Sequence, residues 1–212
     1  IQELKCLLKT KSIGTDSDRA LLLDFQATLE TKPEKAIKLE KDALAQIENI
    51  TADNARLVSN LHANLGGLYR MNGHPDLARE HMEKSISLLD QFNLLHINDS
   101  IPQIANYAMF LTEQQEPERG ISELQKLSGI IKEYHSDDCL DYAKVQETLG
   151  TIYLMTANLP QAKTHFKRAF KIYEKIWADE PEMIEAKYQE IQELYPQIGF
   201  CIGKNLSGLL TK

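Results

Sequence analysis

Residues 149–169 read LGTIYLMTANLPQAKTHFKRA, and residues 65–85, placed 84 positions earlier, read LGGLYRMNGHPDLAREHMEKS. Both segments contain a Leu-Gly pair, a tyrosine three positions after the glycine, a turn with proline and then an alanine. Half of this separation, 42 positions, relates the small residues Ala36, Ala78, Gly120 and Ala162. A fixed period of this length is typical of proteins built from stacked structural repeats. We therefore expect a repeat protein, in which most conspicuous residues serve the packing of the repeats.

Each period divides into two helices separated by a turn. In the second period, apolar residues at helical spacing predict helices over 59–71 and 76–92, with the turn at 72–75. Gly73 suits the left-handed position after a helix, and Pro75 suits a helix start. The fourth period predicts helices over 143–156 and 160–177 in the same way. Small residues such as Gly66 and Ala78 let two helices approach closely, so we expect antiparallel helix pairs.

The period also organises the two ends of the chain, as parts of one continuous domain. Ile1 and Leu8 lie 42 positions before second-helix positions, so we expect a preceding repeat and a natural protein that extends further toward its N-terminus. Tyr188 and Ile191 fall on repeat positions before Pro196 stops the helix, as in an atypical capping helix. The expected segments are a tail helix over 1–12, four repeats over 13–53, 54–98, 99–140 and 141–180, and a capping helix and tail over 181–212, including a short helix within 197–212.

The composition argues against several classes of function. The formal net charge of -7 argues against nucleic-acid binding through bulk positive charge. No apolar run approaches the ~20 residues that a membrane-spanning helix needs. Cys6, Cys139 and Cys201 form no CxxC pair, so we expect no zinc site or disulfide framework, but reduced thiols in a cytoplasmic protein. HExxH, GxSxG and P-loop patterns are missing from the sequence, so we expect no enzymatic activity, no cofactor and no metal.

The helix pair resembles the tetratricopeptide repeat (TPR), whose signature combines L-G-x-x-Y in the first helix with A-x-x-x-F-x-x-A in the second. Residues 149–153 followed by Ala162, Phe166 and Ala169 match this signature in full, and the resemblance covers about residues 17–195. The period of 42 residues exceeds the usual ~34, as in the longer repeats of kinesin light chains and of many bacterial regulators and scaffolds. The resemblance implies an all-α, right-handed α-solenoid (a TPR-like superhelix) of stacked antiparallel helix pairs, whose first helices line a concave groove.

The resemblance also indicates which first-helix positions face this groove. The candidate peptide-binding residues are Asn60, Asn64, Arg70, Asn106, Met109, Lys144, Glu147 and Thr151. The same faces carry Ala63, Gly67 and Met71 in the second period and the more apolar Leu21, Leu22 and Phe25 in the first. Asn64 and Asn106 are equivalent, and their amides could bond the backbone of an extended peptide or satisfy neighbouring helix groups. Arg70 could meet a carboxylate or phosphate of the ligand, or end its helix in solvent.

A few polar residues stand at marked positions of the repeat. Asp24 occupies the position that Gly150 and other small residues hold in later periods. His81 and His165 lie 84 positions apart, so they occupy one repeat position and are not expected to form a ligand pair. His62 takes the place of a bulky helix residue, and we expect it to be packed between helices.

The function predicted from these patterns is that of a protein- or peptide-binding scaffold or adaptor, which uses the concave groove of the repeats. The alternative is a peptide-sensing segment of a larger bacterial regulator, whose effector domain lies outside this sequence. The partner is expected to be a protein or an extended peptide rather than a nucleic acid or a membrane. Self-association is a third possibility, because the end of a repeat array exposes an apolar face unless it is capped.

Overall fold

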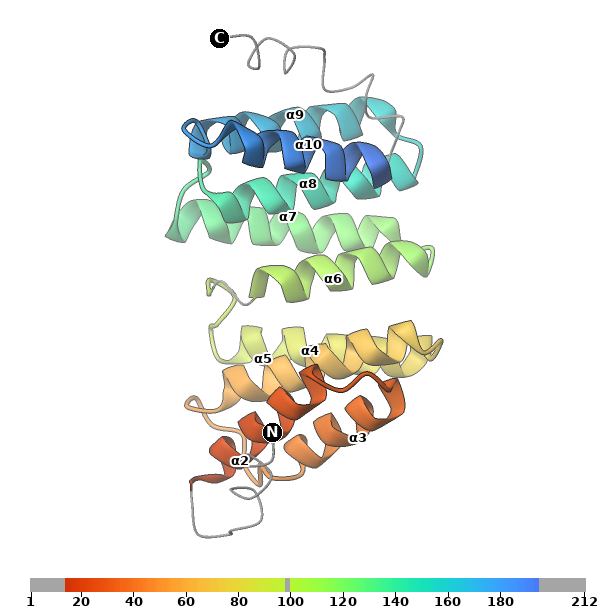
Figure 1. The fold of residues 1–212 in the computed structure, drawn as a ribbon, viewed down its shortest axis with the longest axis vertical. Coiled ribbons are helices and arrows are strands. Elements are labelled where there is room, and N and C mark those ends of the chain that lie inside the picture. The colour runs from red at the N-terminus through yellow and green to blue at the C-terminus, as the bar shows by residue number, and fades with distance from the viewer. Residues whose placement is uncertain (1–13, 98–99, 195–212) are drawn as a thin grey trace. The chain divides into compact units, whose positions relative to one another are not determined.

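The computed structural model describes residues 14–97 and 100–194, and every regular element within these ranges is an α-helix (Figure 1). The helices are α2 (Asp16–Thr28), α3 (Pro33–Leu44), α4 (Ala55–Met71), α5 (Pro75–Gln91), α6 (Ser100–Glu113), α7 (Pro117–Tyr134), α8 (Leu140–Met155), α9 (Leu159–Ile176) and α10 (Pro181–Leu194). The tail helix expected over 1–12 and the short helix expected within 197–212 lie outside the described residues. No helix in the described ranges is both long and apolar enough to cross a membrane.

The 42-residue period is visible in where the second helices begin. Pro33, Pro75 and Pro117 open α3, α5 and α7 at that spacing, and Leu159 opens α9 at the next step. Proline suits the first helical position because its fixed φ matches the helix and the N–H it lacks would have no partner there. The first helices begin earlier than expected: α4 starts at Ala55 rather than at 59, and α8 at Leu140 rather than at 143.

The turn that joins the helices of a pair also repeats. Gly73, Gln115 and Ala157 each have a positive φ, of 71°, 64° and 58°, and they lie 42 positions apart. In each turn the following N–H bonds back to a carbonyl five residues earlier, as His74 N does to Tyr69 O at 2.9 Å and Asn158 N to Tyr153 O at 2.7 Å. This pattern ends the first helix with a left-handed residue and turns the chain back on itself.

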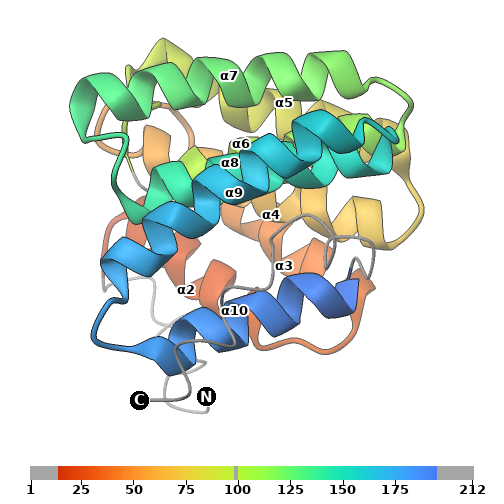
Figure 2. The same ribbon diagram turned by 90° about the horizontal axis from the view of Figure 1, so that it is seen from above.

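The chain divides into two compact units, residues 1–107 and 108–212, with the division inside α6. In unit 1, α2 packs on α3, α3 on α4, α4 on α5, and α2 also contacts α4. In unit 2, α7 packs on α8, α8 on α9 and α9 on α10, and the two views show α8 and α9 side by side (Figure 2). The six-segment division expected from the sequence stays a proposal.

Small residues allow the close helix contacts within each unit. A Cβ added at Gly66 would lie 2.6 Å from Met82 Cγ, and one at Gly150 would lie 2.9 Å from the Phe166 ring. The bulky partners are buried, since Met82 is 4% exposed and Phe166 is 0% exposed. A small residue on the first helix therefore receives a large residue from the second, and the contact is repeated in both units.

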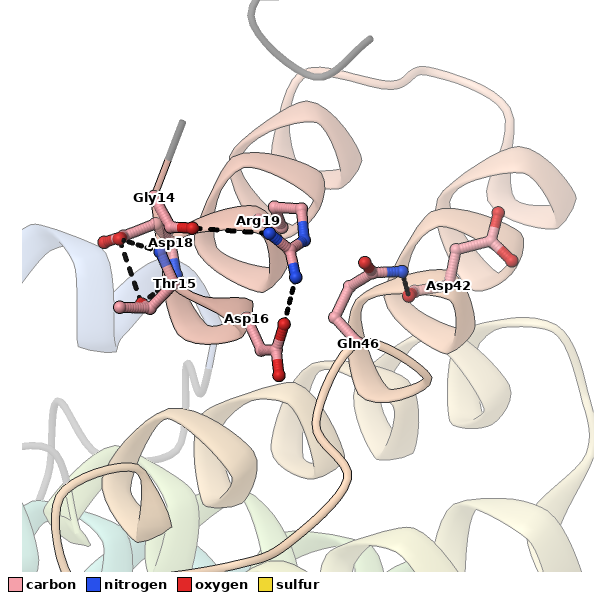
Figure 3. A network of polar contacts seen from close by, with 7 residues as sticks. All are labelled: Gly14, Thr15, Asp16, Asp18, Arg19, Asp42 and Gln46. Atoms are coloured by element: carbon pink, nitrogen blue, oxygen red, sulfur yellow. Dashed lines mark hydrogen bonds and ion pairs between the residues drawn. The ribbon is translucent and has the colours of Figure 1, made fainter. Parts of the chain in front are cut away.

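The N-terminus of α2 is fixed by a local polar network (Figure 3). Thr15 Oγ1 accepts a hydrogen bond from Asp18 N at 3.2 Å, while Asp18 Oδ2 accepts one from Thr15 N at 2.6 Å, which forms a capping box. Arg19 donates to Gly14 O at 3.3 Å and pairs with Asp16. The hydrogen bonds from Thr15 lower the pKa of the Asp18 carboxyl. These contacts set where the first described helix begins.

Candidate functional site

A pocket of about 240 Å³ lies in unit 1 between α4, α5 and α6. Its lining consists of Ala63, Gly67, Arg70, Met71, Met82, Ser85, Gln103 and Asn106. Arg70 and Asn106 belong to the candidate residues predicted from the sequence, and the four lining residues of α4 all occupy positions predicted to face the groove. The structure therefore brings these predicted positions together around one hollow.

The pocket is open because of the small side chains on α4. Apart from its chain neighbours and the backbone of its own helix, a Cβ added at Gly67 would meet none of the described atoms within 4 Å, so the space over this part of α4 is open. Met71 is 74% exposed, and Met82, from α5, is 4% exposed and belongs to the core beneath. Apolar groups thus form one part of the lining, while Arg70 and Asn106 bring polar groups to it.

Gln103 is held in the pocket lining by three hydrogen bonds. Its Oε1 accepts from Ser59 Oγ at 2.9 Å and from Ser85 Oγ at 2.6 Å, and its Nε2 donates to Asn60 Oδ1 at 2.5 Å. These bonds connect α4, α5 and α6. Asn60, a predicted groove residue, therefore orients a lining residue from outside the pocket lining.

Asn64 and Asn106 have different surroundings although they are equivalent in the repeat. Asn106 is exposed and lines the pocket. Asn64 is half-buried, and its Nδ2 donates to Asp24 Oδ1 at 2.8 Å and to Glu40 Oε1 at 3.2 Å. The contacts of Asn64 favour the alternative in which this amide satisfies groups of neighbouring helices.

The predicted residues of unit 2 lie in other contacts. Lys144 is exposed, with its Nζ 3.7 Å from Asp141 Oδ1, and Met109 and Thr151 are half-buried. Glu147 accepts from Tyr173 Oη at 2.6 Å and pairs with Lys187 Nζ at 3.4 Å, so it connects α8 with α9 and α10. Burial and the neighbouring Glu147 charge raise the pKa of the Tyr173 hydroxyl, which keeps it a hydrogen-bond donor. Each of these residues belongs to unit 2, and a ligand contact for any of them stays a proposal.

The histidines follow the repeat as expected. His81 stacks on Tyr69 with ring centroids 5.4 Å apart, and His165 stacks on Tyr153 at 5.3 Å. His81 Nδ1 lies 2.9 Å from Nδ1 of His62, which packs between α4 and α5. His165 Nδ1 makes the corresponding contact at 2.9 Å with Oε1 of a glutamine, Gln146, which lies 84 positions after His62. Among the described residues, no three His, Cys, Asp or Glu side chains form a group that could hold a metal ion.

Replacing His62 with glutamine should make unit 1 less sensitive to acid. Burial, with the neighbouring His81 and Lys84, lowers the pKa of His62 from 6.5 to about 4. The unfolded chain therefore binds a proton at His62 more readily than the folded chain does. The folded chain loses stability as the pH falls from about 6.5 to about 4. Between about pH 7 and pH 5 we expect the variant to lose about 1–2 kcal/mol less than the wild type. Urea unfolding at the two pH values measures this difference, and equal losses would contradict the assignment.

The pocket also contains residues that the sequence reasoning missed. Gln103 stands 42 positions from Leu61 and from Val145, which are both fully buried. A polar residue at a repeat position that is otherwise apolar was the sequence signal that could have identified Gln103. Met82 and Ser85 lie on α5 and are buried in its packing against α4. They also reach the pocket because Gly67 and Ala63 leave that part of α4 uncovered.

Comparison with known proteins identifies the same repeat. Residues 100–175 match the tetratricopeptide repeat family. BtubC (BKLC) from P. vanneervenii has a similar structure, with a TM-score of 0.71 and 18% sequence identity, covering 93% of this chain and 80% of that one. A putative kinesin light chain from Podosopora anserina with nearly identical TPR-like repeats gives a TM-score of 0.69 at 13% identity, covering 84% and 86%. MamA gives 0.57 at 15% identity, covering 82% and 86%.

A search of curated protein sequences found no match. The similar structures confirm the predicted all-α, TPR-like solenoid fold class. At these identities they establish the fold alone, so what this chain binds has to be argued from its own residues.

Proposed function

We propose that this tetratricopeptide-repeat chain is a binding scaffold or adaptor in the cytoplasm, and that the pocket between α4, α5 and α6 anchors its ligand. The ligand is a protein or an extended peptide. The observation that carries the proposal is the open hollow over Gly67, with the exposed Met71 beside it and Arg70 and Asn106 in the same lining. Repeat folds of this kind serve as non-catalytic interaction surfaces, which fits the role.

The pocket chemistry favours an apolar side chain of the ligand, held next to polar backbone groups. Gly67 leaves room for the side chain, and Met71 and Met82 supply flexible thioether contacts. The Asn106 amide can donate to a ligand carbonyl and accept from a ligand N–H. Arg70 adds a cationic group, which suits a carbonyl or a carboxylate of the ligand.

The neighbouring helix α2 extends this apolar surface. Leu21 and Phe25 of α2, and Leu29 directly after its end, lie 42 positions before Ala63, Gly67 and Met71, and they are 50%, 49% and 53% exposed. Since α2 contacts α4 and these positions are equivalent in the repeat, we infer that the large side chains face the same side as the small ones of α4. We propose that the ligand passes over both helices. In unit 2 we propose Met109, Lys144, Glu147 and Thr151 as separate contacts.

Filling the hollow should weaken binding strongly without unfolding the chain. Replacing Gly67 with leucine places a side chain in open space, since the added Cβ would meet nothing of the described chain within 4 Å beyond its own helix backbone and chain neighbours. A ligand side chain excluded from the pocket loses the free energy of its burial, so affinity should fall about 10- to 100-fold. Peptides selected from a displayed random library on the wild-type protein supply the probe, and calorimetric titration measures the loss.

The matched control is leucine at Gly129, an exposed glycine of α7 where an added Cβ also meets nothing. This variant should bind the selected peptides as the wild type does. Undiminished binding by the Gly67 variant would contradict the pocket assignment. A library that yields no binder would contradict the peptide-binding function itself.

A further inference from the structure

The first repeat departs from the others at the contact where a small residue meets a large one. In the second and fourth repeats this contact joins Gly66 to Met82 and Gly150 to Phe166. The positions 42 residues before Gly66 and Met82 are Asp24, on α2, and Glu40, on α3. Two carboxyl groups thus occupy a place that is apolar in the other repeats.

The two carboxyl groups share one amide. Asn64 Nδ2, from α4, donates to Asp24 Oδ1 at 2.8 Å and to Glu40 Oε1 at 3.2 Å. Glu40 is 1% exposed, and its Oε2 has no hydrogen-bond partner among the described residues. The amide of Asn64 supplies only two hydrogens, one for each carboxyl group. An ionised Glu40 would therefore keep Oε2 without a partner at a buried place, next to the half-buried carboxylate of Asp24.

No cation in the described part of the chain pairs with either carboxyl. The groups that face Glu40 are Asp24 from α2 and the neutral Asn64 from α4. On α3 itself, Lys38 and Lys41 are exposed, and Lys41 Nζ lies 5.5 Å from the centre of the Tyr69 ring. Burial contributes most to a rise in the pKa of Glu40 to about 8, and the Asp24 charge and a hydrogen bond with Asp24 contribute the rest of the rise.

We propose that Asp24, Glu40 and Asn64 form a buried proton-binding site that fastens α2, α3 and α4 together. With the proton bound, one carboxyl oxygen becomes a donor, the two carboxyl groups bond each other, and a single negative charge remains. Once the proton leaves, two like charges face each other in a buried contact, and α2 and α3 open locally. The pocket between α4, α5 and α6 is a separate feature, so this proposal does not depend on the ligand.

The direction of the pH effect follows from linkage. In the unfolded or opened segment Glu40 has the ordinary pKa of 4.5, while in the closed repeat it is about 8. The closed form therefore holds more protons between these values, and its stability falls as the pH rises through the window. As the pH rises from 4.5 to about 8, the equilibrium constant for local opening of α2 and α3 should increase by up to about tenfold per pH unit.

Hydrogen exchange between pH 6 and pH 9, corrected for intrinsic rates, tests the proposal on the whole chain. We expect the protection of residues 16–44 to fall steeply with rising pH. The protection of α8 and α9 serves as the internal reference. The Glu40→Gln variant keeps the shape but cannot ionise, so its protection should be flat. The double variant Asp24→Gly and Glu40→Met copies the second repeat and should also be flat. Glu34→Gln, at an exposed position of α3, should behave as the wild type.

The proposal would be overturned if the protection of residues 16–44 in the wild type did not change with pH. It would also be overturned if the Glu40→Gln variant lost protection with rising pH as the wild type does. Carbon-13 NMR of the glutamate carboxyls needs no variant: Glu40 should titrate far above the other glutamates, and a midpoint near 4.5 would refute the site. Calcium chloride added at pH 9 should not restore protection. Restoration would mean that the pair binds a cation rather than a proton.

Discussion

Replacing Gly120 with alanine should destabilise the chain strongly, although alanine normally stabilises a helix. The added Cβ would lie 2.6 Å from the carbonyl oxygen of Ala108 and 3.2 Å from its carbonyl carbon and its Cα. These are backbone atoms of another helix, which cannot rotate away as the end of a side chain can. We expect a loss of at least about 2 kcal/mol in the free energy of unfolding, measured by urea denaturation.

The control for this variant is on the same helix. Gly129 is an exposed glycine of α7, and a Cβ added there would meet nothing within 4 Å. Alanine at Gly129 should therefore stabilise by about 0.5–1 kcal/mol, because glycine is the costlier residue inside a helix. If both alanine variants changed stability in the same direction, the close contact at Gly120 would be wrong.

Replacing Phe166 with alanine should have the largest effect on stability. Phe166 is 0% exposed and belongs to a buried cluster with Ala162, Phe170 and Ile191. Truncating a fully buried phenylalanine removes its burial energy and leaves a cavity, so we expect a loss of about 3–5 kcal/mol. Urea denaturation or calorimetry measures it, and a loss below about 1 kcal/mol would contradict the core position.

A second substitution tests whether the Phe166 ring is in close contact with Gly150. In the wild type, alanine at Gly150 would place its Cβ 2.9 Å from the Phe166 ring and should destabilise. In the Phe166→Ala background that ring is missing, so the same alanine should be neutral or stabilising. The double-mutant cycle therefore predicts a strong coupling between the two sites. Additive effects would mean that alanine at Gly150 does not destabilise the chain through contact with the Phe166 ring.

The helix pairs could be predicted from the sequence because the period marks the positions where helices touch. Gly66, Gly120 and Gly150 stand at such positions for a physical reason: a larger side chain would overlap the partner helix. The helix starts were less well predicted, since the apolar stripe shows which face is buried but not where the first turn begins. Ser59 was expected to open a helix, and it lies one turn inside α4, buried and bonded to Gln103.

The pocket could be predicted only in part. Arg70 and Asn106 reach it because their repeat positions fix their direction. Asn64 holds an equivalent position but bonds Asp24 and Glu40, and this could not be inferred from the second repeat alone. Its partners belong to the first repeat, which departs from the pattern at both positions. Side-chain contacts of this kind depend on the neighbouring repeat, whereas the fold depends on the period.

Methionine methyl NMR tests the binding account most directly, because the chain contains five methionines. Met71 and Met82 line the pocket, while Met183 lies on α10 in the other unit. When a peptide selected on the wild-type protein is titrated in, the methyl signals of Met71 and Met82 should shift together and saturate, and that of Met183 should stay in place. Unchanged signals from Met71 and Met82, with a saturating shift at Met183, would contradict the account.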